Sequence, residues 1–208
     1  PRVRPVRRAL FVAPALLIGA VFCGVLMVAT ESQAQSGAQR LVEAHLMERF
    51  SLRADQLKLI RLSGRDLPAG SEEFYAEFRG GRDDNINCLV YADRAYCSRS
   101  DGEFQRFMAD YRYFDKTGLS APQVMRLYAL LALPRQLKYI DARALTRDAA
   151  KYQAFPGIAP PALAHTDAGM TLAFCATPAL QLEPTQWIVT LSRDYQLDVR
   201  QGPALGAR

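Results

Sequence analysis

Four cysteines and two histidines are the side chains of this sequence best suited to chemistry. Cys88 and Cys97 lie in the stretch NINCLVYADRAYC, where a tight turn at Ala92-Asp93 would place them opposite each other. Counted outward from that turn, they fall at a non-hydrogen-bonded pair, where antiparallel backbones come closest and a disulfide fits. The sequence therefore predicts a Cys88–Cys97 disulfide formed in an oxidising compartment, although Ala-Asp is not a favoured turn pair.

The remaining candidates do not form a recognisable catalytic or metal-binding pattern. Cys175 is expected to be a lone buried thiol, and a metal site made from Cys88, Cys97, Cys175 and His165 would lack any known ligand spacing. The sequence contains no C-x-x-C-H, G-x-S-x-G, P-loop, H-E-x-x-H or dinucleotide-binding motif. We therefore predict no catalytic residue, no metal and no cofactor.

The histidines and one pair of acids each have an ordinary structural interpretation. His165 stands near Asp167 in an expected loop, an arrangement that can activate a nucleophile but is common by chance. His45 lies on the apolar side of an expected helix and is predicted to be a hydrogen-bonded core residue. Asp83-Asp84, with Asn85, are typical of a surface turn, and calcium loops need more oxygen ligands at set spacings.

The positive charge is concentrated at the N-terminus. Four of the 26 Lys and Arg residues lie within residues 1–8 and no acid precedes Glu31, so the rest of the chain has 22 basic residues against 21 acidic ones. A domain so close to neutral lacks the basic face that binds phosphates. Nucleic acid is therefore excluded as an expected partner.

Residues 9–30 contain no charged side chain and would span about 33 Å as a helix, the thickness of a hydrocarbon core. Arginines precede this segment, which predicts a cytoplasmic N-terminus. The chain is thus expected to cross a bacterial inner membrane once, with its C-terminal domain in the periplasm. A signal peptide cleaved after Ala34 is the main alternative, but its apolar run would be shorter. A lipoprotein cleaved before Cys23 would need a small residue in place of Phe22.

Small residues recur along the predicted membrane helix at four-residue spacing. Ala15, Gly19 and Cys23 form one row, and Ala20 with Gly24 forms a second. Such rows let another helix approach closely, although Gly and Ala are common in membrane helices in any case. Other integral membrane subunits and the lipid bilayer are therefore the expected partners. The segment has no ionisable side chain to ligate haem or relay protons.

Hydrophobic periodicity predicts an α+β fold of antiparallel sheet packed with helices, with two tandem αβββ units as an alternative. A linker at residues 31–37 is followed by an extracytoplasmic domain at 38–200 and a tail at 201–208. Helices are expected at 38–50, around 104–111 and from Ser120, where Ser-x-x-Gln resembles a capping box. Strands are expected at 57–63 and 74–78, as the two strands of a hairpin over 85–97, and at 170–174, 187–191 and 195–199, with a loop at 155–168.

Two segments of the chain begin alike. Gln56-Leu57-Lys58 and Gln136-Leu137-Lys138 each follow an expected helix and open an extended segment. This similarity favours a division of the domain into halves at 38–99 and 100–200, which a duplication would explain. Three identical residues are weak support for a duplication.

The helix before LKLIRLS, then FYAEFR and CLVYADRAYC, resembles the helix-plus-curled-sheet modules of the PepSY or cystatin-like type over residues 38–97. Modules of this type are exported domains associated with binding or inhibition. The resemblance rests on the order of elements, so it implies no catalysis and assigns no functional residue.

Three functions remain open. The preferred expectation is a non-catalytic accessory subunit of an inner-membrane complex, with photosynthetic or respiratory electron-transfer assemblies as the first guess. The second is a membrane-tethered periplasmic binding or envelope-assembly factor, which a deep apolar pocket would favour. The third is a hydrolase that uses His165.

Overall fold

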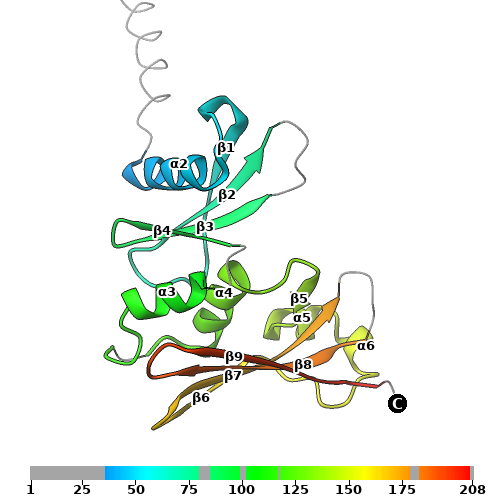
Figure 1. Cartoon of the computed structure of the whole chain (residues 1–208). Coiled ribbons are helices and arrows are strands. Elements are labelled where there is room, and N and C mark those ends of the chain that lie inside the picture. Colours follow the sequence, from blue (N-terminus) through cyan, green and yellow to red (C-terminus); the bar gives the residue numbers. More distant parts are fainter. Residues whose placement is uncertain (1–35, 80–84, 99–101, 117, 179–182, 207–208) are drawn as a thin grey trace, which may run out of the picture. The chain divides into compact units, whose positions relative to one another are not determined.

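The computed structural model describes residues 36–79, 85–98, 102–116, 118–178 and 183–206, which form an α+β fold with two antiparallel sheets (Figure 1). Within these residues, no helix has the length and apolar character needed to cross a membrane. The anchor at 9–30 lies outside the described residues, as do its small residues Ala15, Gly19, Ala20, Cys23 and Gly24. The anchor and its helix-packing rows therefore stay predictions.

The first sheet is a meander in which each strand pairs with the next one along the chain, in the order β1-β2-β3-β4. Its elements are α2 (Gly37–Phe50), the 3-10 turn η1 (Ala54–Gln56), β1 (Leu57–Leu62), β2 (Glu72–Phe78), β3 (Ile86–Tyr91) and β4 (Arg94–Cys97). Antiparallel strands joined by short connections need no crossover helix, so α2 is free to cover one face. The predicted helix and all four strands are confirmed.

The β3–β4 hairpin has the predicted register. Ala92 and Asp93 both have positive φ angles, 46° and 58°, which is the conformation of the tight hairpin turns that suit twisted strands. Cys88 therefore lies opposite Cys97, with 4.1 Å between their Cα atoms, and the two form a disulfide. The predicted disulfide is confirmed.

The second sheet has the order β5-β7-β8-β9, with β6 paired to β7. The remaining elements are α3 (Glu103–Asp110), α4 (Ala121–Leu131), β5 (Leu137–Tyr139), α5 (Ala142–Arg147), α6 (Ala149–Tyr152), β6 (Ala162–Thr166), β7 (Gly169–Pro178), β8 (Thr185–Ser192) and β9 (Leu197–Ala204). At the start of α4, the predicted capping box is present, because Gln123 Oε1 accepts a hydrogen bond from the Ser120 N–H at 2.9 Å.

Two expectations for this half were wrong. Residues 155–168 are not a continuous loop, since β6 forms there by pairing with β7. The tail expected from residue 201 is also shorter, because β9 continues along β8 as far as Ala204. In both places a neighbouring strand supplies the hydrogen bonds that a weak local β propensity does not by itself secure.

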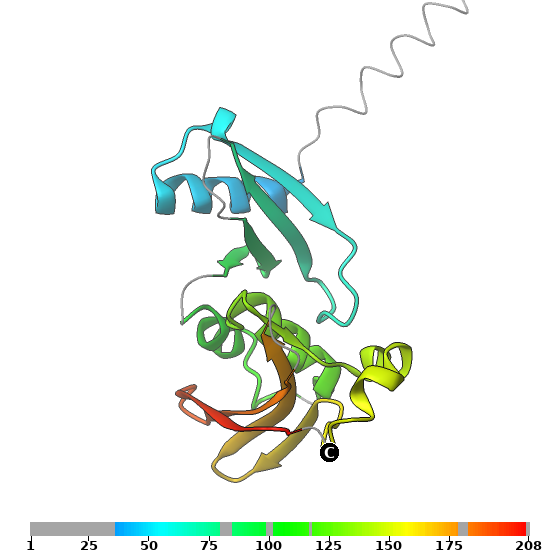
Figure 2. The ribbon, with the colours of Figure 1, turned by 90° about the vertical axis from the view of Figure 1, so that its right-hand side faces the viewer.

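Two hydrophobic cores use opposite faces of the first sheet. On one face, Val42 and Leu46 of α2 pack over the strands and the disulfide. On the other, Leu89 and Tyr96 join a larger core that includes α3, α4 and one face of the second sheet (Figure 2). Helices α3 and α4 thus lie between the two sheets. A third small cluster packs α5 and α6 against Cys175 on the far face of β7.

The two halves share the order of their main strands. In each, a helix precedes a four-stranded meander, and the chain between β5 and β7 contains α5, α6 and β6 as additions. Leu57 opens β1 opposite Phe78, and Leu137 opens β5 opposite Pro178. The repeated Gln-Leu-Lys phrase therefore occupies the same place in both sheets.

Candidate functional site

A cavity of about 180 Å³ lies where four segments that are distant in sequence come together. They are the loop between β1 and β2, the first turns of α4, the connection from β5 into α5, and the residues just before β6. The lining residues are Asp66, Pro122, Met125, Tyr139, Asp141, Ala142, Arg143, Pro160 and Pro161. Nothing in the sequence singled out this group, because no two of the four segments are adjacent along the chain.

Backbone geometry fixes the two carboxylates of the cavity. Asp66 is exposed and has a φ of 58°, a conformation that Asp and Asn tolerate better than most residues. Asp141 is the N-cap of α5, and its Oδ1 accepts a hydrogen bond from the Ala144 N–H at 2.6 Å. Asparagine can take either of these roles, so the negative charge is not needed for the local structure.

Behind the cavity wall, a buried ion pair joins the two halves of the domain. Arg126 of α4 lies 2.5 Å from Glu73 Oε1 of β2, and the Glu73 side chain is only 2% exposed. Burial raises the pKa of Tyr139, and Asp141 and Asp66 raise it further, whereas Arg126 lowers it through its charge and a hydrogen bond. The charges of both carboxylates therefore favour the neutral form of the Tyr139 hydroxyl.

The chemistry of the cavity suits binding. Its wall combines apolar groups with two carboxylates and one arginine at the rim, and the Arg126 guanidinium behind it is already engaged by Glu73. A general acid or base would need a positioned nucleophile or substrate group beside it, and this wall supplies no serine, threonine, cysteine or histidine. The arrangement can hold a small ligand or a single side chain.

His165 lies on β6 rather than in a loop, which corrects the sequence-based expectation. Its Nε2 lies 2.7 Å from the hydroxyl of Tyr113, and the two rings stack with centroids 5.8 Å apart. Burial raises the pKa of Tyr113 to about 12, so the phenol stays protonated, and the tautomer of the imidazole decides which of the two groups donates. The hydrogen bond and the stacked rings connect β6 to the segment that follows α3.

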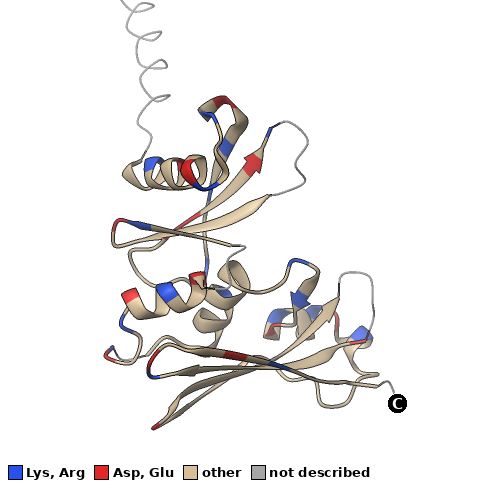
Figure 3. Ribbon diagram, in the orientation of Figure 1, with Lys and Arg blue, Asp and Glu red and all other residues tan. Residues whose placement is uncertain are grey.

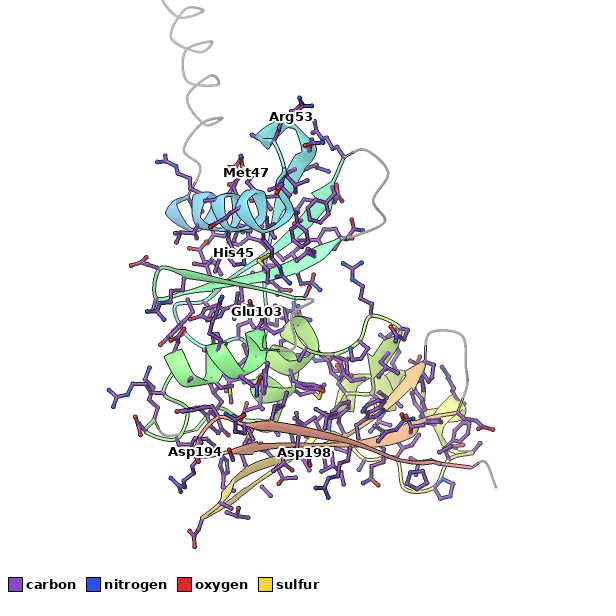
Figure 4. All side chains as sticks on the ribbon, in the orientation of Figure 1. His45, Met47, Arg53, Glu103, Asp194 and Asp198 are labelled. Atoms are coloured by element: carbon purple, nitrogen blue, oxygen red, sulfur yellow. A yellow bond between two sulfur atoms is a disulfide. The ribbon has the colours of Figure 1, made fainter. Side chains whose placement is uncertain are left out.

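A second polar cluster connects α2 and α3 to β4 beside the disulfide, near the labelled His45 and Glu103 (Figure 4). Arg49 donates to the carbonyl of Cys97 at 3.2 Å, and Arg106 lies 2.9 Å from Glu103 Oε2. Burial raises the pKa of Glu103, against the influence of the two arginines. His45 Nε2 is buried without a hydrogen-bond partner among the described residues, so the prediction that His45 is a hydrogen-bonded core residue is wrong for this atom.

We expect stability to depend on His45 in weakly acidic solution. Burial, Arg106 and Arg49 all lower the pKa of His45 below its usual 6.5, so the folded protein binds this proton less readily than the unfolded chain does. The His45 contribution should therefore be favourable above pH 6.5 and be lost as pH falls from 6.5 through the folded pKa. Urea unfolding at pH 7.5 and 5.5 should show a smaller loss for His45→Gln than for the wild type.

The other histidine provides the control. In a His165→Gln background, His45→Gln should still reduce the loss of stability between the two pH values, because the effect belongs to His45. Glu103 opposes the effect, since its raised pKa relieves a cost as pH falls, but it is present in every variant. An unchanged pH dependence in His45→Gln would contradict the assignment.

The cysteines do not provide a metal site. Cys88 and Cys97 are bonded to each other in the disulfide, and Cys175 is a buried free thiol under α5 and α6. Over the ranges that the structure describes, no cluster of three or more His, Cys, Asp or Glu side chains is placed to hold a metal ion. Asp83-Asp84 lie outside those ranges.

Comparison of the chain with protein-family models, with curated proteins and with solved structures finds no match. The resemblance of residues 38–97 to PepSY or cystatin-like modules therefore stays a prediction.

Proposed function

We propose that the protein is a non-catalytic accessory subunit of a larger inner-membrane assembly, attached by one N-terminal helix and by its exported α+β domain. The predicted anchor at 9–30 supports the attachment, and the Cys88–Cys97 disulfide fits an oxidising periplasm. Photosynthetic and respiratory electron-transfer complexes are the first candidate hosts. The resemblance to exported binding modules agrees with a role in contact rather than in chemistry.

The observation that carries this proposal is the outer face of the second sheet. Met170, Leu172 and Phe174 of β7 point to the core, so the alternate residues Thr171 and Ala173 point away from it. Their partners across the sheet are also small or uncharged. These partners are Ala162 and Ala164 on β6 and Ile188 and Thr190 on β8.

Charge is scarce on this face. Most of β6, β7 and β8 is free of acidic and basic residues (Figure 3). On β9, Asp198 and Arg200 neutralise each other at 2.7 Å, and Ile188 is 36% exposed. A solvated antiparallel sheet face usually carries polar side chains in alternation, whereas interface cores are depleted of charge. The face is therefore suited to contact with another subunit.

The test is the size of the protein extracted from its own membrane in mild detergent, with mass spectrometry and a visible spectrum on the same peak. We expect the wild type to co-migrate with a larger assembly. Ile188→Arg should release it, because a charge in the middle of the contact must be desolvated. Ala44→Arg, which places the same charge on the exposed side of α2, should remain in the assembly.

The second candidate is a membrane-tethered binding or envelope-assembly factor. The cavity lined by Asp66 and Asp141 favours it, because it offers a defined place for a ligand. At about 180 Å³, however, the cavity is smaller than the 300–1,000 Å³ of ordinary ligand pockets. Migration of the extracted wild type as a free monomer would contradict the subunit proposal and favour this candidate.

A further inference from the structure

We propose that the cavity between Asp66 and Asp141 binds the ammonium group of an aliphatic amine, presented as a lysine side chain by a partner protein. The inference goes beyond the accessory-subunit proposal and does not depend on it, because a tethered binding factor would use the same site. It rests on the size, the hydrogen-bonding character and the charge of the cavity wall.

The size of the cavity limits the ligand. Its volume of about 180 Å³ equals roughly six water molecules at ~30 Å³ each. The four methylenes and the ammonium of a lysine side chain are five heavy atoms, which fit this space. A nucleotide or a lipid headgroup with its acyl chains would not fit. A single side chain inserted from outside is the matching occupant.

The wall offers hydrogen-bond acceptors from two sides. Pro160 and Pro161 lie outside helices and strands and have no backbone N–H, so their main chain can offer only carbonyl groups. Asp66 and Asp141 add carboxylates, and only Oδ1 of Asp141 is used by the N-cap bond to Ala144. A ligand that donates several hydrogen bonds complements such a wall, and an ammonium group has three N–H donors.

Charge selects the same ligand. Two carboxylates and one guanidinium line the cavity, so its net charge is negative, and Arg126 behind the wall is neutralised by Glu73. The two acids approach from different segments, the β1–β2 loop and the start of α5. Separated acceptors suit a compact ammonium, whereas a planar guanidinium is best matched by one carboxylate in bidentate contact. Met125, which is fully buried, and the proline rings can pack against the methylenes.

The experiment uses the full chain in detergent micelles, with its methionine methyl groups labelled for NMR. Met125 lies at the cavity, whereas Met108 of α3 lies in the core between the sheets and serves as an internal reference. Titration with n-butylammonium chloride at constant ionic strength should shift the Met125 methyl signal in a saturable way and leave Met108 in place. Nα-acetyl-lysine N-methylamide, whose side-chain ammonium is free, should bind with similar affinity, as expected for a lysine side chain within a protein.

Charge-removing variants decide the mechanism. Asp66→Asn with Asp141→Asn keeps both the left-handed backbone and the N-cap, so the fold is preserved while two charges are lost. We expect n-butylammonium to bind at least tenfold more weakly to this variant. Asp93→Asn is the matched control, because Asp93 also has a positive φ, 58°, but lies in the β3–β4 turn. Its affinity should equal that of the wild type.

Several results would overturn the inference. One is the absence of a saturable shift at Met125, and another is equal affinity in the doubly substituted variant. Binding of neutral n-butanol as tightly as n-butylammonium would show an apolar pocket without charge recognition. Tighter binding of n-butylguanidinium than of n-butylammonium would identify arginine, not lysine, as the preferred ligand. If n-butylammonium bound but Nα-acetyl-lysine N-methylamide did not, a lysine side chain of a protein would be excluded as the ligand. None of these outcomes depends on whether the protein co-migrates with an assembly.

Discussion

Arg126→Met is expected to destabilise the domain by about 3 kcal/mol, because it leaves the Glu73 carboxylate buried without its charge partner. The Glu73 side chain is 2% exposed and the Arg126 side chain 33% exposed, so the pair is shielded mainly on the acidic side. Glu73 Oε2 already has no hydrogen-bond partner among the described residues. Urea unfolding followed by circular dichroism should show the loss as a lower midpoint.

A double variant distinguishes the effect of removing the charge partner of Glu73 from the effect of losing the packing of the Arg126 side chain. Glu73→Leu combined with Arg126→Met should recover most of the stability, since a buried ion pair can often be replaced by apolar residues of similar volume. Leucine suits position 73, because its partners on the neighbouring strands are Leu62 and Leu89.

An exposed pair between β1 and β2 is the control. Lys58 and Glu77 lie 2.9 Å apart, with side chains 50% and 38% exposed. Lys58→Met should change the free energy of unfolding by no more than about 0.5 kcal/mol, because solvent screens such pairs. If Arg126→Met were as mild as this control, the Glu73–Arg126 pair would not contribute as argued.

Cys88→Ala with Cys97→Ala is expected to cost about 2 to 3 kcal/mol. The disulfide closes a loop of about ten residues, and the chain-entropy relation gives a stabilisation of this size. Both cysteines are fully buried beneath α2, and alanine is chosen because serine would add hydroxyl groups to that core. Thermal unfolding of the oxidised wild type and the double variant measures the difference.

Thiol chemistry tests the bond itself. When the chain is unfolded without reductant, an alkylating reagent should modify two of its four cysteines, Cys23 and Cys175. Reduction should raise the number to four. Cys175→Ala controls for the loss of a buried thiol that is not cross-linked, and it should be milder than the double variant. Modification of all four without reductant would contradict the disulfide.

The sequence predicted the elements whose signals are local. Alternation of apolar residues in β2 and the turn at Ala92-Asp93 were sufficient to place strands and register, because the period of a strand and the spacing around a turn are properties of one segment. The capping pattern at Ser120 likewise marked the start of α4. Apart from the buried Glu73, polar and apolar positions in these segments agree with their burial.

The elements and contacts that require segments distant in sequence were not predicted. β6 exists because ALAHT pairs with β7, and its isolated propensity is weak. Helices α5 and α6 are short, and their apolar residues pack on Cys175 from the far side of β7. The cavity needs four segments at once, and Asp141 could have been recognised only as a helix cap. Contacts between the halves, such as Glu73 with Arg126, have no signal in either segment alone.

The position of α3 and α4 between the two sheets bears on how the domain unfolds. Leu89 and Tyr96 of the first sheet share one core with Phe174 of the second, so neither half can lose its structure without exposing apolar surface of the other. Such coupling makes a single cooperative transition the natural behaviour of this unit. Trp187, the only tryptophan of the chain, stacks on Phe174 in the second sheet. Its fluorescence should therefore report the unfolding caused by substitutions in the first sheet.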